Sequence, residues 1–191
     1  MATRRIDPDQ LAREIARRAT SDRLGGEHGF VIPSKYVEQA LELIERGETA
    51  AAAAIFDVVC EASPRSGEAF NNRGFCRLPD DPAAALHDLE KAASLGMDGA
   101  PTTVGNRMLA LSRLGRYATA LEVADAWWSS SRSAAGRIYM WDFHHDGNLV
   151  MKVDPVEYVA DRASEIGQSS RDAVSHSRWR KRLETRRGEP S

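Results

Sequence analysis

A spacing of 68 residues recurs in this 191-residue sequence and constrains its fold more than any other feature. Three pairs of residues share this separation: Gly47 with Gly115, Ala52 with Ala120, and Phe56 with Ala124. Half of the spacing is about 34 residues, a period typical of stacked helix–turn–helix units. Ala85 lies near the midpoint of the second pair, where a middle unit would place it. Because such units bury their apolar faces against one another, the sequence predicts a row of helix pairs.

Helix start and stop signals divide the sequence at the same period. Asp81 and Pro82 suit the N-cap and the first turn of a helix, and Gly47 and Gly115 suit helix ends. The 28 alanines favour helices and allow them to pack closely. The expected helices span residues 33–47 and 48–61, 68–78 and 83–95, and 101–114 and 117–129.

The units also share a residue pattern. In the first unit it consists of Tyr36, Ala40, Leu43, Gly47, Ala52, Phe56, Val59 and Pro64. The other units carry parts of it in Ala69–Gly74 with Ala85–Ala92, and in Leu111, Leu114–Tyr117 and Ala120. This pattern resembles the tetratricopeptide repeat (TPR) family over residues 33–132. The resemblance implies an all-α, helix–turn–helix solenoid of about three repeats with capping helices at its ends.

The resemblance further implies that the first helix of each unit lines a concave groove. Such a groove would bind a protein or peptide partner, as an extended peptide or a partner helix. Asn71 and Asn106 are suited to holding the partner's backbone, because amides both donate and accept hydrogen bonds. Phe75 is suited to anchoring an apolar side chain. The alternative is that these side chains only form a solvated surface. The groove residues are expected to be Glu38, Leu41, Glu45, Asn71, Phe75, Leu78, Asn106, Leu109 and Arg113.

Flanking segments are expected to complete the domain. Residues 1–32 would supply an N-terminal capping helix, over 8–20, and a linker. Residues 133–167 would combine an aromatic segment with a C-terminal capping helix that begins after Asp154 and stops at Gly167.

The aromatic segment leaves two interpretations open. A small β-hairpin over 137–153 is favoured by the Asp146–Gly147 turn signal between two apolar runs. The first helix of a degenerate fourth unit, from Ala134 to about His144, is favoured by the helix pairs that precede it.

The last segment, residues 168–191, is a basic tail with a net charge of +4. Trp179 lies among its cations and is suited to stacking on bases. We expect this tail to be partly disordered. The positive charge of the tail and the position of Trp179 favour an alternative function, a nucleic-acid-associated regulator that makes a weak contact through residues 171–187. The net charge of −2 for the whole chain argues against a protein that coats nucleic acid.

Two groups of residues could have chemical roles, as a metal site and as a redox pair, but their spacing and neighbours in the sequence favour neither role. His144, His145 and Asp146 suggest a metal site, but adjacent histidines point apart and no further ligands follow at a suitable spacing. A polar turn is the favoured interpretation. Cys60 and Cys76 could form a redox pair, but neither has a CxxC or basic surrounding, so they are interpreted as small buried residues.

Catalytic and membrane signatures are also lacking. The sequence contains no GxSxG, P-loop or HExxH motif, so we expect a non-enzyme without cofactor or metal. No apolar run reaches the roughly 18–20 residues of a membrane span. The N-terminus lacks the apolar region of a signal peptide, which favours a cytoplasmic location without a membrane partner.

Overall fold

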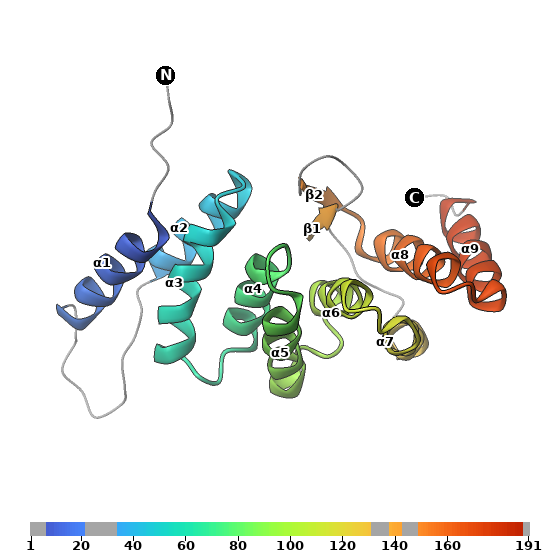
Figure 1. The fold of residues 1–191 in the computed structure, drawn as a ribbon, viewed down its shortest axis with the longest axis horizontal. Coiled ribbons are helices and arrows are strands. Elements are labelled where there is room, and N and C mark those ends of the chain that lie inside the picture. The colour runs from blue at the N-terminus through green and yellow to red at the C-terminus, as the bar shows by residue number, and fades with distance from the viewer. Residues whose placement is uncertain (1–6, 22–33, 131–137, 143–148, 189–191) are drawn as a thin grey trace, which may run out of the picture.

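Helices follow one another in pairs along a curved row (Figure 1). The computed structural model describes residues 7–21, 34–130, 138–142 and 149–188. The elements are α1 (Pro8–Ser21), α2 (Ser34–Glu45), α3 (Thr49–Ala62), α4 (Gly67–Arg77), α5 (Pro82–Ala92), η1 (Ala93–Met97), α6 (Pro101–Arg113), α7 (Tyr117–Ser130), β1 (Ile138–Asp142), β2 (Leu149–Val153), α8 (Pro155–Ser169) and α9 (Ala173–Gly188). Each helix packs on its neighbours, from α1 against α3 to α8 against α9. The all-α fold with one small hairpin is confirmed for these residues.

The turns of the first and third helix pairs have the same geometry. Gly47 and Gly115 have φ angles of +74° and +71°, in the left-handed region that glycine adopts without a steric cost. After each glycine, the next backbone N–H donates to the carbonyl five residues earlier, at 2.8 Å in both turns. This is a Schellman ending, which satisfies a helix carbonyl and reverses the chain. The 68-residue spacing therefore corresponds to a repeated local structure.

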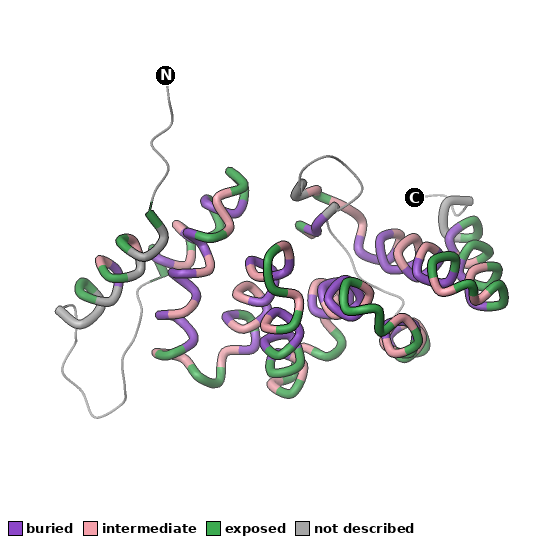
Figure 2. Tube along the Cα trace, viewed as in Figure 1, coloured by how far each residue is buried: buried purple, intermediate pink, exposed green. Residues whose placement is uncertain are grey.

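Small residues lie where the paired helices touch, as the sequence predicted. Ala52, Ala85 and Ala120 are fully buried. A Cβ atom at Gly74 would lie 2.8 Å from the Cγ of Leu89, so α4 and α5 could not approach as closely with a larger residue there. Figure 2 shows that buried positions continue along the whole row of helix pairs.

Four charged side chains, which we name the ionic cluster, join α3, α4 and α5: Asp57, Arg73, Arg77 and Asp88. Arg73 makes a bidentate pair with Asp88, with N···O distances of 2.9 and 2.6 Å. Arg77 contacts Asp88 at 2.9 Å and Asp57 at 2.7 Å. Asp88 is fully buried, so its charge would be costly without a partner. The two guanidinium groups compensate this charge.

The C-terminal end of the row differs from the sequence prediction. Helix α8 does not stop at Gly167 but continues to Ser169, and α9 packs against it. A Cβ atom at Gly167 would lie 2.6 Å from the backbone N of His176, so this glycine permits a close helix contact. The predicted capping helix is therefore followed by another, α9, which occupies residues 173–188 of the tail that was expected to be partly disordered.

The aromatic segment forms the hairpin and not the helix. Strands β1 and β2 pair antiparallel, with Ile138 opposite Val153 and Asp142 opposite Leu149. The hairpin lies on the side of the row formed by α4, α6 and α8 (Figure 1). The alternative helix from Ala134 to about His144 is wrong, because residues 138–142 are extended. An isolated two-stranded hairpin is only marginally stable, so packing against these helices is what stabilises it.

Candidate binding groove

A pocket of about 250 Å³ lies between the first helices of the three predicted units and strand β1. None of its described lining residues is charged, and five of them are apolar or aromatic. Helices α2, α4 and α6 therefore form a common surface, which the hairpin borders on one side. The lining residues are Leu41, Ile44, Asn71, Asn72, Phe75, Thr102, Asn106, Ile138 and Tyr139.

Three buried polar side chains, which we name the amide cluster, lie beside this pocket: Asn71, Thr103 and Asn106. The Thr103 hydroxyl donates to Asn71 Oδ1 at 3.0 Å, and Asn106 Nδ2 donates to the same oxygen at 3.4 Å. This assignment leaves Asn106 Oδ1 as an acceptor, and it has no hydrogen-bond partner among the described residues. Asn106 is 1% exposed, so the unpartnered oxygen carries a desolvation cost.

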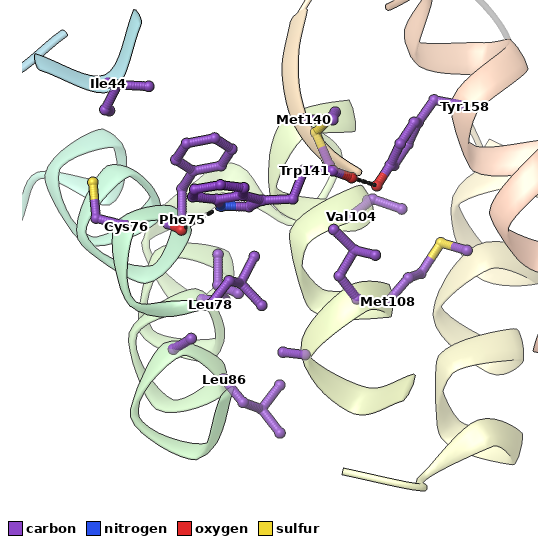
Figure 3. Packing of buried hydrophobic residues seen from close by; sticks show 14 of the residues in the cluster. Ile44, Phe75, Cys76, Leu78, Leu86, Val104, Met108, Met140, Trp141 and Tyr158 are labelled. Carbon is purple, nitrogen blue, oxygen red and sulfur yellow. Dashed lines mark hydrogen bonds between the residues drawn. The ribbon is translucent and has the colours of Figure 1, made fainter. Parts of the chain in front are cut away.

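Phe75, predicted to anchor a partner's side chain, is instead covered by the chain's own strand β1. Its ring stacks on that of Trp141, with centroids 5.1 Å apart and planes inclined by 21° (Figure 3). The Trp141 indole N–H donates to the Phe75 carbonyl at 2.7 Å. That carbonyl lies in the last turn of α4, where it accepts only a long bond of 3.4 Å from the Leu78 N–H of its own helix end. Phe75 is therefore mainly a core residue, with only part of its side chain at the pocket.

The remaining contacts of the hairpin fix it firmly in the groove. Met140 is fully buried and lies against Gly105 of α6, where a Cβ atom would approach its Cε to 2.6 Å. The Tyr158 hydroxyl of α8 donates to the Trp141 carbonyl at 3.2 Å (Figure 3). Adjacent strand residues thus reach different helices, because successive side chains point to opposite faces. Among the described residues, strand β1 fills the part of the groove next to α8, and the pocket lies at the α2 end.

The structure brings four of the nine predicted groove residues together at the pocket: Leu41, Asn71, Phe75 and Asn106. Glu38 and Glu45 are exposed on α2. The other three lie elsewhere. Leu78 is fully buried, while Leu109 and Arg113 border a separate cavity of about 150 Å³ between α6 and α8. Arg113 also donates to the Pro79 carbonyl at 3.1 Å, which joins the ends of two units.

Five pocket residues were missed: Ile44, Asn72, Thr102, Ile138 and Tyr139. Helical spacing could have found two of them, because Ile44 follows Leu41 by three positions and Thr102 precedes Asn106 by four. Ile138 and Tyr139 could not be found this way, because no local signal in the sequence places the hairpin on α4 and α6.

A hydrogen bond links the rim of the pocket to α2. The Tyr139 hydroxyl donates to Glu45 Oε1 at 2.8 Å. This bond to a carboxylate raises the pKa of Tyr139 above its ordinary value, because the phenol gains a partner that prefers its protonated form. Lys152 of β2 lies over the Tyr139 ring, with its Nζ 5.2 Å from the ring centroid.

The two cysteines do not form a reactive pair near neutral pH. Burial raises the pKa of Cys60 to about 11 and raises that of Cys76 further, so both thiols stay protonated near neutral pH. The three-residue His144–Asp146 group lies outside the described residues. No group of three or more His, Cys, Asp or Glu residues that could hold a metal occurs within the described ranges.

The basic tail is engaged with the rest of the protein. Trp179 is fully buried, so the stacking on bases predicted for it is not available in this structure. Arg178 and Arg182 pair with Asp125 of α7 at 2.7 and 2.8 Å. The Arg182 guanidinium also lies 4.3 Å from the centroid of the Trp179 ring. These contacts attach α9 to α7 through the residues that were expected to reach nucleic acid.

Comparison with protein-family models, curated proteins and solved structures finds no match to this chain. The resemblance to the TPR family thus stays a prediction based on the 68-residue spacing and its residue pattern. None of the helices in the described part of the chain is both long enough and apolar enough to cross a membrane.

Proposed function

We propose that the protein is a non-catalytic, TPR-like interaction module that binds a protein or peptide partner at the α2 end of its groove. The binding residues are those of the pocket, with Leu41 as its most accessible apolar contact. Leu41 is 43% exposed, although it is a large apolar side chain next to buried residues. A cytoplasmic location belongs to the same proposal.

The observation that carries this proposal is the composition of the pocket. It combines apolar walls with buried amide groups, an arrangement typical of sites that bind an apolar group and orient it with a few hydrogen bonds. Its volume of about 250 Å³ lies below the roughly 300–1,000 Å³ of pockets for small molecules and cofactors. A side chain of a larger partner fits the pocket better than a complete cofactor does.

A comparison of two arginine substitutions tests the proposal. Leu41→Arg would place a charge at the pocket, whereas Leu114→Arg changes a leucine of similar exposure, 38%, at the α6–α7 turn. Purified protein and both variants are used to capture partners from cell extract, and circular dichroism verifies that each is folded. We expect partners that bind the wild type and Leu114→Arg but not Leu41→Arg. Partner sets that are the same for both variants would contradict the proposal.

Phe75→Ala is less suitable for this experiment. Phe75 is 4% exposed and stacks on Trp141, so its truncation would destabilise the protein by about 3–5 kcal/mol. A loss of binding would then report on the fold and not on the pocket.

A further inference from the structure

We infer that the groove is selective for a peptide that carries one large apolar side chain next to cationic residues. The inference rests on the proposed function and adds the chemical class of the partner. It is carried by three features of the pocket: its size, its unpartnered amide acceptor, and the charges beside it.

The size and lining of the pocket define the anchor. A space of about 250 Å³ between Leu41, Ile44 and Ile138 has room for a single leucine-like or aromatic side chain. Because strand β1 occupies the neighbouring part of the groove through Trp141 and Met140, a partner has little apolar surface to contact in that direction. One anchoring residue is therefore expected, and not a long apolar stripe.

The amide cluster specifies what lies beside the anchor. Asn106 Nδ2 is directed at Asn71, which leaves Asn106 Oδ1 as a buried acceptor with no donor among the described residues. A peptide backbone N–H is a donor of the right kind for this oxygen. The oxygen is closed off from solvent in the free protein, so a partner would reach it only by displacing the side chains of this wall. Its backbone N–H would then remove the desolvation cost of the oxygen, which favours a peptide over a purely apolar ligand.

The charges beside the pocket select the flanking residues of the partner. Glu38 and Glu45 lie three positions before and four positions after Leu41, so they share its face of α2, and both are exposed. Glu42, also exposed, follows on the same helix. Of the described cations on α2 and the hairpin, Lys35 and Lys152 lie over tyrosine rings and Arg46 pairs with Glu48. Among the described side chains beside the pocket, carboxylates therefore predominate, which favours lysine or arginine in the partner.

Three capped peptides of about nine alanine-based residues provide the probes. The first has a central leucine between lysines, the second a central leucine between glutamates, and the third a central glycine between lysines. Each is titrated into ¹⁵N-labelled full-length protein at low salt. The side-chain amide signals of Asn71, Asn72 and Asn106 report directly on the pocket.

We expect the leucine–lysine peptide to shift these signals and to bind about threefold to tenfold more tightly than the leucine–glutamate peptide, as two exposed ion pairs would give. The glycine peptide should leave the signals unchanged. In a Glu38→Gln/Glu45→Gln variant the preference for lysine should fall to the small part that Glu42 supplies, while Tyr139 keeps an amide acceptor at position 45. In Leu41→Arg, both leucine peptides should lose binding, whereas Leu114→Arg should match the wild type.

Equal or tighter binding of the leucine–glutamate peptide would overturn the cationic selectivity and leave the proposed groove intact. If none of the peptides shifts the three amide signals, the inference is wrong, and the proposed function is then decided by the separate comparison of Leu41→Arg with Leu114→Arg.

Discussion

The two sides of helix α4 bury polar groups in opposite ways. Arg73 and Arg77 belong to the ionic cluster, whereas Asn71 and Phe75 face the groove, two positions away and thus about 200° around the helix. In the ionic cluster both arginines contact both carboxylates. In the amide cluster one oxygen has no partner among the described residues. The first arrangement is suited to holding helices together, and the second to receiving a donor from another molecule.

Replacing Asp88 is expected to have the largest effect, because it tests whether the ionic cluster stabilises the packing of α3, α4 and α5. Asp88→Ala would remove the buried partner of two partly buried guanidinium groups and leave them only the half-exposed Asp57, so we expect a loss of up to about 3–5 kcal/mol in the free energy of unfolding. Urea denaturation followed by circular dichroism measures it. Asp57→Asn is the matched control, because Asp57 is 46% exposed and its replacement should cost about 1 kcal/mol or less. Equal losses for the two variants would show that the cluster does not depend on burial.

On the groove side, Asn71→Ala is expected to have the next largest effect. Asn71 Oδ1 accepts hydrogen bonds from both Thr103 and Asn106, so its removal leaves two buried donors without their acceptor. We expect a loss of about 1–3 kcal/mol in the free energy of unfolding. The same urea denaturation measures it, and a loss well below 1 kcal/mol would indicate that water replaces the missing amide.

Asn106→Leu tests whether the amide cluster serves binding more than stability. It removes the unpartnered oxygen together with one long hydrogen bond of 3.4 Å. These effects oppose each other, so the free energy of unfolding should change by less than about 1 kcal/mol in either direction. Peptide binding should nevertheless weaken, since the acceptor for the partner's backbone is gone. A variant that is strongly destabilised, or that binds the leucine–lysine peptide as well as the wild type, would contradict the role assigned to this oxygen.

The sequence predicted the features that depend on local spacing. The turns at Gly47 and Gly115, the cap at Asp81 and the buried alanines all follow from residues close together in the chain. Asn71 and Asn106 lie 35 positions apart, close to half of the 68-residue spacing, and the family resemblance predicted both for the groove.

Contacts between distant segments could not be predicted in the same way. Trp141 covers Phe75 from 66 positions away, and only the path of the chain after α7 brings them together. The burial of Trp179 depends on how α9 packs against α7 and α8, so its cationic neighbours in the sequence predicted stacking on bases instead. Arg77 of α4 pairs with Asp57 of α3 and Asp88 of α5, two contacts that no local spacing in the sequence predicts.

The smallest effect concerns the hydrogen bond at the pocket rim. The bond from Tyr139 to Glu45 raises the pKa of the phenol above its ordinary value of about 10 in the folded protein. Its contribution to stability is therefore fully present below pH 10 and is lost as the pH rises through the folded pKa. Replacing the carboxylate by an amide, in Glu45→Gln, should lower the pKa of Tyr139 and move this loss to lower pH. Spectrophotometric titration of the tyrosines near 295 nm, with the wild type and Tyr139→Phe for assignment, measures the change. A Tyr139 pKa that is the same with and without the Glu45 carboxylate would show that the hairpin docks without this bond, through Trp141 and Met140 alone.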